Sequence, residues 1–474
     1  MSFEPIGAVI FLLGMAMLFV GEKAALGIFL PCVLLQSAAA MLLPGVGVVQ
    51  PGHFALGFVI LVAMKSQRSR DAIFDRTKFG KLEILLVCTL IYGLLSAFFL
   101  PRLFQYAITV NAIGGGSVLF GTERVQLEPT SGNITQPIYF IGDIICYFVV
   151  RGLCRSDAAF WLGVRAVMLT CVLNCAFGLL DIATKATGTT FLLGIIRNST
   201  YGLLTEVSSG SFFRIVGSYT EASAFAGATL STFTVSCRLW LGNVYPRINL
   251  PIAMLSLLLL LFSTSSTGYA GLPVCFALLY FGALYRITCG KSSYMDAYFV
   301  SAVPLTIFII ICFIIYDHDL FQQLSFFFDQ ALFSKGSSES GIERGTWNAD
   351  ALQSFYSSYG LGIGLGSTRA SSFLLACLSN IGALGSMFFG LFILGIVIGG
   401  LSAETTATAH CRAALRLGCL GTIIAASISG TLVDLGLWFY TLAALATTND
   451  ISRVPAIARD KFIARWSPAV GGRR

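Results

Sequence analysis

The sequence predicts an all-α integral membrane protein with about 12 or 13 transmembrane helices and two large loops on its outer side. Hydrophobic residues make up 56% of the 474 residues and charged residues only 11%, whereas a soluble domain has about a quarter charged residues. Apolar stretches long enough to span a bilayer follow one another, and basic residues gather in alternate loops. These observations exclude a soluble enzyme and a nucleic-acid-binding protein.

The first half of the chain predicts six spans joined by basic and polar loops. Its apolar runs cover about residues 5–20, 24–43, 54–64, 82–100, 137–150 and 158–182. The loop 65–81 is basic, so the positive-inside rule places it in the cytoplasm. The polar, glycine-rich loop 105–136 then lies outside, and Arg151 and Arg155 mark the next cytoplasmic turn.

The second half predicts further spans within the same polytopic domain, 1–474. They cover about residues 222–241, 250–262, 268–285, 298–316, 373–400, 417–431 and 436–446. The long loops 183–221 and 317–369 lie on the outer side in this assignment, and the basic tail 447–474 lies in the cytoplasm. Residues 190–204 are apolar enough to predict a helix lying in the membrane interface.

The most distinctive motif is Arg214-x-x-Gly217-x-x-x-Glu221, at the end of an outer loop and directly before a predicted span. A charged side chain at the centre of a membrane helix costs about 2.5–3.5 kcal/mol on insertion scales, so charges at this boundary indicate a function. The outer position predicts an anionic ligand for Arg214. Glu221 either pairs with Arg214 or, if desolvated, acts as a base with a raised pKa.

A second charged cluster lies in the loop 317–369. It consists of Lys335, Glu339, Glu343, Arg344, Trp347 and Asp350. Arg344 and Arg369 share the outer side with Arg214, and a guanidinium binds phosphate oxygens through two parallel hydrogen bonds. We therefore expect the three arginines to hold a pyrophosphate, with Lys335 and Trp347 contributing to the same site. The alternative is that each arginine only contacts lipid headgroups.

Two further stretches supply backbone and hydroxyl groups on the outer side. Glycines alternate along 360–366, where they either expose amide hydrogens to an anion or form a tight turn packed against helices. Their spacing and the membrane context exclude a dinucleotide-binding fingerprint. The tip 263–267 is a run of serines and threonines whose hydroxyls, including that of Ser265, either bind phosphate or sugar or cap a helix.

The cysteines and histidines do not predict a metal site. Most of the 13 cysteines lie inside apolar runs, where a thiol behaves as a small apolar group. The outer loops contain almost none, which argues against a disulfide framework. The three histidines are scattered, so we expect no metal ion and no cofactor.

Taken in order, these motifs resemble the Wzy-type polysaccharide polymerase and O-antigen ligase superfamily of bacterial inner-membrane proteins. The resemblance covers roughly residues 214–380. It rests on Arg214-x-x-Gly217 with Glu221, the hairpin 263–268, Arg344-x-x-Trp347, the glycines of 362–366 and the stretch Leu378-Ser379-Asn380-Ile381-Gly382.

The resemblance implies a metal-independent, inverting glycosyl transfer of the C-type fold at the periplasmic face. The donor is a glycan on undecaprenyl pyrophosphate, and the acceptor is another lipid-linked repeat unit or a lipid A core sugar. Family arginines in the loops of Arg214 and Arg344 are thought to bind the pyrophosphate. Membrane lipids and a chain-length-regulating membrane protein are the other partners we expect.

The sequence favours a polymerase over the alternatives. Ligases of the superfamily carry a histidine just after the glycine-rich stretch, where this chain has Arg369-Ala370-Ser371-Ser372. A flippase or other transporter needs polar residues along its spans, whereas here the charges gather in outer loops and no repeat relates the two halves. No Gly-x-Ser-x-Gly motif or pair of aspartates within a span supports an intramembrane hydrolase. A non-catalytic assembly subunit is the remaining alternative.

Overall fold

The computed structural model describes most of the chain. The described residues are 2–43, 47–74, 80–112, 124–199, 208–209, 212–317, 338–399 and 406–448, together with 319, 321–323, 325 and 329. Lys335 and residues 449–474 of the basic tail lie outside this set.

Seven helices of the described part are long and apolar enough to cross a membrane. They are α5 (Lys81–Leu103), α6 (Gly132–Leu153), α7 (Asp157–Thr187), α10 (Ser266–Thr288), α11 (Tyr294–Tyr316), α14 (Phe373–Ile398) and α15 (Ala407–Ser429). Shorter apolar helices accompany them, namely α1 (Pro5–Val20), α3 (Pro51–Lys65), α9 (Pro246–Phe262) and α16 (Gly436–Thr447). The predicted class, an all-α protein with several helices fit to cross a membrane, is confirmed.

The remaining helices and the strands are short or more polar. The helices are α2 (Glu22–Val33), α4 (Gln67–Phe74), α8 (Ala222–Leu241) and α13 (Glu339–Ser357). The strands form three antiparallel sheets, made of β1 (Ser2–Phe3), β2 (Met41–Leu43) and β3 (Gly47–Val49), of β4 (Thr109–Asn111) and β5 (Arg124–Gln126), and of β6 (Ser208–Ser209) and β7 (Phe212–Phe213). In register, Leu42 faces Val48 and Val110 faces Val125.

Two sequence predictions of single helices were wrong. The run 24–43 is not one helix, because α2 ends at Val33 and β2 pairs with β1 and β3. Between them, the Ser37 hydroxyl donates to the carbonyls of Ile196 (2.8 Å) and Ser218 (2.9 Å), so this polar turn is held by hydrogen bonds. Within the predicted interfacial helix 190–204, the structure has only a short 3-10 helix at Thr190–Ile196, and residues 200–204 lie outside the described residues.

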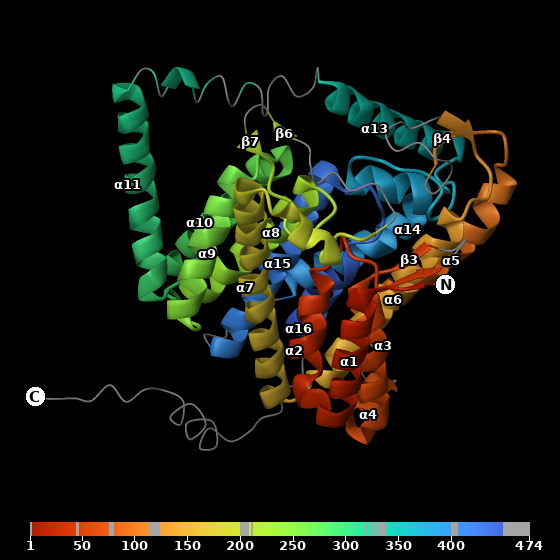
Figure 1. The fold of residues 1–474 in the computed structure, drawn as a ribbon, viewed down its shortest axis with the longest axis horizontal. Helices are drawn as coiled ribbons and strands as arrows, with labels where there is room; N and C mark the ends of the chain where they lie inside the picture. The colour runs from red at the N-terminus through yellow and green to blue at the C-terminus, as the bar shows by residue number, and fades with distance from the viewer. Residues whose placement is uncertain are drawn as a thin grey trace, which may run out of the picture.

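Helix α8 lies at the centre of the molecule and is surrounded by other helices (Figure 1). Many of its side chains are small and almost all are buried, which allows close helix packing of the kind membrane proteins use. Ser231 donates to the carbonyl of Gly418 (2.9 Å), and Thr234 donates to that of Leu417 (3.1 Å). These bonds fix α8 against α15. Helix α11, by contrast, stands at the edge of the molecule, and its side chains are largely exposed.

Helix α5 connects two ends of the helix bundle that differ in chemistry. Its last turn reaches the glycine-rich run, where a Cβ on Gly364 would lie 2.7 Å from Pro101. Its first residue, Lys81, lies at the other end, about 30 Å away at 1.5 Å per residue. We call the first end, with Arg214, Glu221 and Arg344, the loop end. The second, with Lys81, is the basic end.

Candidate functional site

Three predicted site residues meet at the loop end, although they come from different segments. Arg214 follows β7, Glu221 is the residue before α8, and Arg344 lies in the second turn of α13. Burial lowers the pKa of Arg214, the nearby charge of Glu221 opposes this, and the like charge of Arg344 adds to the lowering. Tyr269 of α10 is also close enough to affect the Arg214 charge. The structure therefore brings Glu221 and Arg344 within electrostatic range of Arg214.

The part of the chain that the structure describes offers no ion pair to Arg214 or Arg344. Among the described residues, neither Arg214 nor Arg344 has a carboxylate within salt-bridge distance, and the buried Nε of Arg214 has no hydrogen-bond partner. Glu221 instead accepts a hydrogen bond from the hydroxyl of Ser223. The ion pair between Arg214 and Glu221, one of the two alternatives from the sequence, is not formed. Two guanidinium groups without an anion are suited to bind one.

The serine-rich tip joins this site through α10. Ser265 precedes α10 but makes no capping hydrogen bond, so the capping alternative is wrong for Ser265. Its hydroxyl and that of Thr264 are buried without a partner. Tyr269, one turn later, lies close enough to Arg214 for its phenol to influence the pKa of Arg214. Tyr269 therefore connects the tip with Arg214. The tip thus carries two hydroxyls without a hydrogen-bond partner, one turn before the tyrosine that lies near Arg214.

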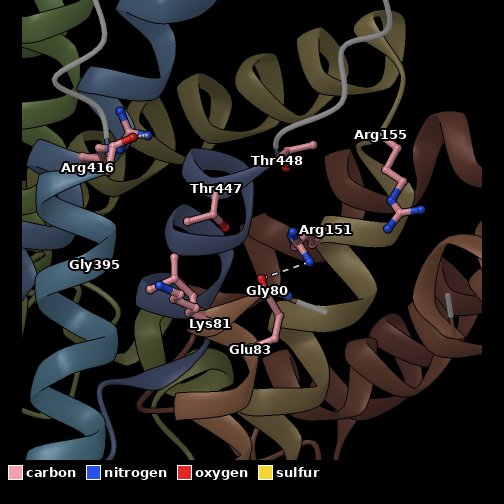
Figure 2. A pocket seen from close by; sticks show the side chains of 11 residues that line it. Gly80, Lys81, Glu83, Arg151, Arg155, Gly395, Arg416, Thr447 and Thr448 are labelled. Atoms are coloured by element: carbon pink, nitrogen blue, oxygen red, sulfur yellow. Dashed lines mark hydrogen bonds and ion pairs between the residues drawn. The ribbon is translucent and has the colours of Figure 1, made fainter. Parts of the chain in front are cut away.

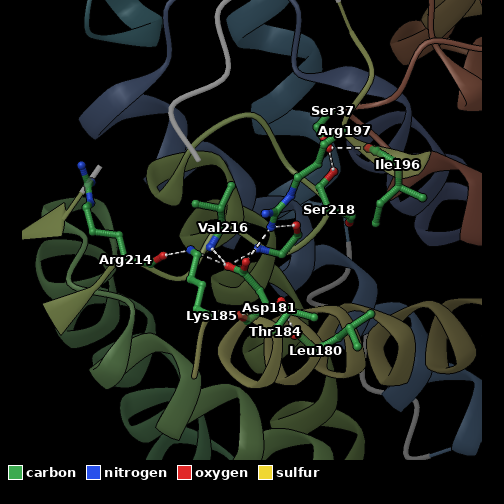
Figure 3. A network of polar contacts seen from close by, with 11 residues as sticks. Ser37, Leu180, Asp181, Thr184, Lys185, Ile196, Arg197, Arg214, Val216 and Ser218 are labelled. Carbon is green, nitrogen blue, oxygen red and sulfur yellow. Dashed lines mark hydrogen bonds and ion pairs between the residues drawn. The ribbon is translucent and has the colours of Figure 1, made fainter. Parts of the chain in front are cut away.

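A buried network holds the Arg-x-x-Gly segment in place (Figure 3). Asp181 of α7 accepts hydrogen bonds from the amides of Val216 (2.7 Å) and Gly217 (3.1 Å). It also forms ion pairs with Lys185 (3.0 Å) and Arg197 (2.7 Å). One carboxylate thus ties two cations to the backbone turn that follows Arg214.

The two cations extend this network to the carbonyl groups of the same segment. Lys185 donates to the carbonyl of Arg214 (2.6 Å), and Arg197 donates to that of Gly217 (2.6 Å). Figure 3 shows the Arg214 side chain pointing away from Asp181. The backbone of Arg214 is therefore fixed, while its guanidinium is left for another partner.

Gly217 serves the backbone geometry of this segment. Its φ of +60° lies in the left-handed region, and a Cβ there would approach Phe225 to 2.9 Å. Because its amide is bonded to Asp181, that amide is not available to a ligand. The glycine of the motif explains how the chain turns between Arg214 and Glu221.

Helix α13 is anchored below Arg344 by its own polar contacts. Asp350 pairs with Arg124 of β5 (2.7 Å) and accepts a hydrogen bond from Asn111 of β4 (2.9 Å). Arg344 and Trp347 are both half-buried, and a spacing of three residues places them on the same helix face. The anchor fixes the face that carries Arg344 and Trp347.

The glycine-rich run does not offer its amides to a ligand. Each amide from 360 to 369 donates within the protein, to a set of acceptors that includes the carbonyls of Phe355, Ser358, Ser379, Asn380 and Asn111 and the side-chain oxygens of Ser358, Ser96 and Asn380. The anion-binding interpretation of these amides was therefore wrong, and the alternative of a packed turn is correct.

Asn380 organises this turn from a kink in α14. Its Oδ1 accepts hydrogen bonds from the amides of Gly366 (3.1 Å) and Ser367 (3.2 Å). The kink lies at Gly382, with a φ of +61°. A Cβ on Gly366 would lie 2.2 Å from the carbonyl oxygen of Gly132. Only glycine fits such close backbone approaches.

The remaining predicted site residues are placed as follows. Arg369 is exposed, and its amide donates to the carbonyl of Asn111 (3.0 Å), so it lies beside the anchor of α13. No contact joins its side chain to Arg214 among the described residues. Lys335 lies outside the described residues. A role for Arg369 in the site remains a prediction.

Sequence reasoning missed two clusters of buried charge. The first is the Asp181 network. In the second, Asp143 of α6 contacts His53 of α3 (3.1 Å) and lies beside Asp434, close enough for the two carboxyl groups to influence each other. Asp434 lies in the turn between α15 and α16, so the statement that no two aspartates pair within the spans is not contradicted. Single aspartates inside apolar runs were the available signal. Within the described residues, no group of three acidic, histidine or cysteine side chains is arranged to hold a metal ion.

Comparison with known proteins found no matching family model, curated protein or solved structure. The geometry of the site therefore carries the functional argument.

Proposed function

We propose that the protein is a polymerase that joins undecaprenyl-pyrophosphate-linked repeat units into a surface polysaccharide at the periplasmic face of the bacterial inner membrane. The observation that supports this most is the meeting of Arg214, Glu221 and Arg344 at the loop end. Two guanidinium groups that have no carboxylate partner among the described residues, with a carboxylate nearby, suit a reaction that releases an anion and takes up a proton.

The chemistry of glycosyl transfer fits these groups. The acceptor hydroxyl attacks the anomeric carbon of the donor, and the bond between that carbon and the pyrophosphate oxygen breaks. Arg214 and Arg344 stabilise the charge that develops on the pyrophosphate, and the hydroxyls of the serine tip bind phosphate or sugar. Glu221 accepts the proton of the attacking hydroxyl. A guanidinium-stabilised leaving group needs no general acid.

The proposed topology places the loop end outside. About 12 or 13 spans follow from the long and short apolar helices together with α2 and α8, and the positive-inside rule puts the basic end in the cytoplasm. Loops 183–221 and 317–369 are then periplasmic. The prenyl chain of the donor lies among the apolar side chains of the bundle.

A reconstituted reaction tests the proposal. Purified protein is incubated with one labelled lipid-linked repeat unit and no lipid A, with and without EDTA. A polymerase gives a ladder that grows by whole repeats, and EDTA does not stop it. Product that forms only when lipid A core is added would identify a ligase. Movement of the lipid across a bilayer without a new glycosidic bond would identify a flippase.

One observation favours a second candidate, a proton-coupled flippase of lipid-linked oligosaccharide. Asp143 and Asp434 are in contact inside the bundle with His53 beside them, and adjacent carboxyl groups can hold one proton between them. Buried ionisable groups in spans mark proton pathways in transporters. Asp143→Asn would abolish lipid translocation driven by a pH gradient in a flippase, whereas a polymerase would retain a glycan ladder with the same substitution.

A further inference from the structure

Among the described residues, the exposed tyrosines lie at the two ends of the helix bundle and not along its middle. At the basic end they are Tyr245, between α8 and α9, Tyr285, in the last turn of α10, and Tyr294 and Tyr298, at the start of α11. At the loop end they are Tyr106, Tyr316, Tyr356 and Tyr359. Tyrosine is enriched at both membrane–water interfaces, because its ring is apolar and its hydroxyl is polar. The two groups therefore mark two interfaces.

The separation of the two groups matches the thickness of a membrane. Tyr298 and Tyr316 both belong to α11, and about 27 Å of helix lies between them at 1.5 Å per residue. No charged residue occurs between these two tyrosines in the sequence, and the side chains exposed there are mostly apolar. The hydrocarbon core of a bilayer is about 30 Å thick, so α11 carries one tyrosine at each of its boundaries.

Basic side chains lie at the same end as the first group of tyrosines. Lys81, Arg151, Arg155 and Arg416 line the pocket shown in Figure 2, where α5 begins and α6 ends. Tyrosine together with lysine and arginine anchors the ends of transmembrane helices at the interface. The basic end therefore has the composition of one membrane interface, and the second group of tyrosines marks the other.

The C-terminal half of α13 and the turn that follows it have polar side chains inside and uncharged side chains outside. The exposed residues of 349–359 are Ala349, Leu352, Gln353, Tyr356, Ser357 and Tyr359. The inner side includes Asp350, Ser354 and Ser358, which are buried, and Asp350 forms the ion pair with Arg124. A helix that faces water on its outer side carries charges there and apolar side chains inside. The outer face of this half of α13 therefore fits an apolar environment.

Two tyrosines of the loop end adopt an unfavourable backbone conformation although they are exposed. Tyr106 follows α5 with a φ of +60°, and Tyr359 follows α13 with a φ of +54°. A bulky residue is rare in this left-handed region. Tyr359 is 89% exposed and Tyr106 is 64% exposed, so packing inside the protein does little to compensate. Contact of the two rings with something outside the protein would do so.

We propose that the C-terminal half of α13 lies in the membrane interface at the loop end, with Leu352, Tyr356 and Tyr359 in contact with phospholipid. Figure 1 shows α13 lying across the loop end, near the height at which α11 ends, with its C-terminal half lower than its start. An amphipathic helix in this position buries its apolar face at the boundary between headgroups and acyl chains. Because this face carries no charge, it contacts zwitterionic and anionic lipids equally.

The placement also concerns the candidate site. Arg344 and Trp347 belong to the same helix, so an interfacial α13 keeps them close to the level of the lipid headgroups. A lipid-linked anion would then reach Arg344 without leaving the membrane surface. The inference itself rests on the exposed side chains and not on the proposed function, and its test measures lipid contact and not glycan synthesis.

The test uses the purified full chain in lipid nanodiscs. An environment-sensitive fluorescent amino acid replaces Tyr356 in one variant and Leu352 in another. Two matched controls carry it at Glu128, an exposed acidic residue of the loop end, and at Ile309, an exposed apolar residue in the middle of α11. Quenching is measured with iodide in the water, with a nitroxide on the lipid headgroup and with a nitroxide on the acyl chain.

We expect the headgroup nitroxide to quench positions 352 and 356 several-fold more strongly than iodide does, to the same extent in phosphatidylcholine and phosphatidylglycerol. Position 128 should be quenched mainly by iodide, and position 309 mainly by the acyl-chain nitroxide. Iodide quenching at 352 and 356 as strong as at 128 would overturn the proposal and leave this face open to a protein or a glycan. The absence of quenching by all three agents would also overturn it, because protein would then cover the face. The two positions report separately, so one variant suffices if the other does not fold.

Discussion

Arg214 and Arg344 differ from four other arginines that the structure describes. Arg124, Arg151, Arg197 and Arg286 each form an ion pair with an aspartate or glutamate. Arg214 and Arg344 have no such partner among the described residues, although each is half-buried. Keeping a buried cation without a carboxylate is costly, so the pair is best explained by an anionic ligand.

We expect Arg214→Ala and Arg344→Ala each to reduce glycan elongation by tens to thousands of fold. Losing one charged contact to a desolvated anion costs about 2–5 kcal/mol. Lysine at either position rescues poorly, because it lacks the two-pronged hydrogen bonding of arginine. The rate of ladder growth measures the effect, with the exposed Arg102→Ala as control. Normal elongation in both alanine variants would place the donor elsewhere.

Glu221→Gln tests the assignment of the general base. We expect kcat to fall by about 10²–10⁴-fold with little change in the donor KM, because glutamine cannot accept the proton. The exposed Glu128→Gln at the same end serves as control. A raised KM with an unchanged kcat would show instead that Glu221 acts only by orienting Arg214.

Asp181→Asn tests the network behind Arg214. The substitution leaves Lys185 and Arg197 buried without their carboxylate, and breaking a buried ion pair costs about 3–5 kcal/mol. We expect a lower unfolding temperature and slower elongation. Asp157→Asn, at the start of the same helix and outside any described ion pair, should leave both unchanged. An unaltered unfolding temperature for Asp181→Asn would contradict the network's structural role.

Secondary-structure elements show what the sequence predicts well and what it does not. Apolar runs predicted the bounds of α1 and α8 because hydrophobicity is a local property. The sequence could not decide between an anion site and a packed turn for the glycine-rich run. The side chains that accept hydrogen bonds from its amides include those of Ser96 and Asn380, which lie in other helices. The contact of Asp143 with Asp434 likewise joins segments far apart in the chain. Local patterns identify elements, whereas these contacts depend on how the elements pack.

Gly366→Ala tests the glycine-rich turn as an element. Gly366 has a φ of +87°, and a Cβ there would collide with the carbonyl of Gly132. We expect much less folded protein in the membrane, measured by fluorescence-detected size exclusion. Gly390→Ala, in α14, should leave the yield unchanged, because a Cβ added at Gly390 has no atom within 4 Å. Equal yields of the two variants would mean that the turn tolerates a side chain.

The topology of the whole molecule is tested by chemical labelling of cysteines. On a background without native thiols, Ile342→Cys places a thiol on the exposed face of α13, and Arg68→Cys places one on α4 at the opposite end. We expect an impermeant maleimide to label position 342 in intact cells and position 68 only after the inner membrane is opened. The reverse pattern would show that the assignment of sides is wrong.

The whole molecule is proposed to be a polymerase, and the ratio of released undecaprenyl pyrophosphate to new glycosidic bonds tests this. Purified protein receives a single lipid-linked repeat unit, and both new glycosidic bonds and released undecaprenyl pyrophosphate are counted. We expect one pyrophosphate to be released for each bond formed, and both products to be lost in Arg214→Ala. Pyrophosphate release without bond formation, or no release while the lipid crosses a bilayer, would contradict it.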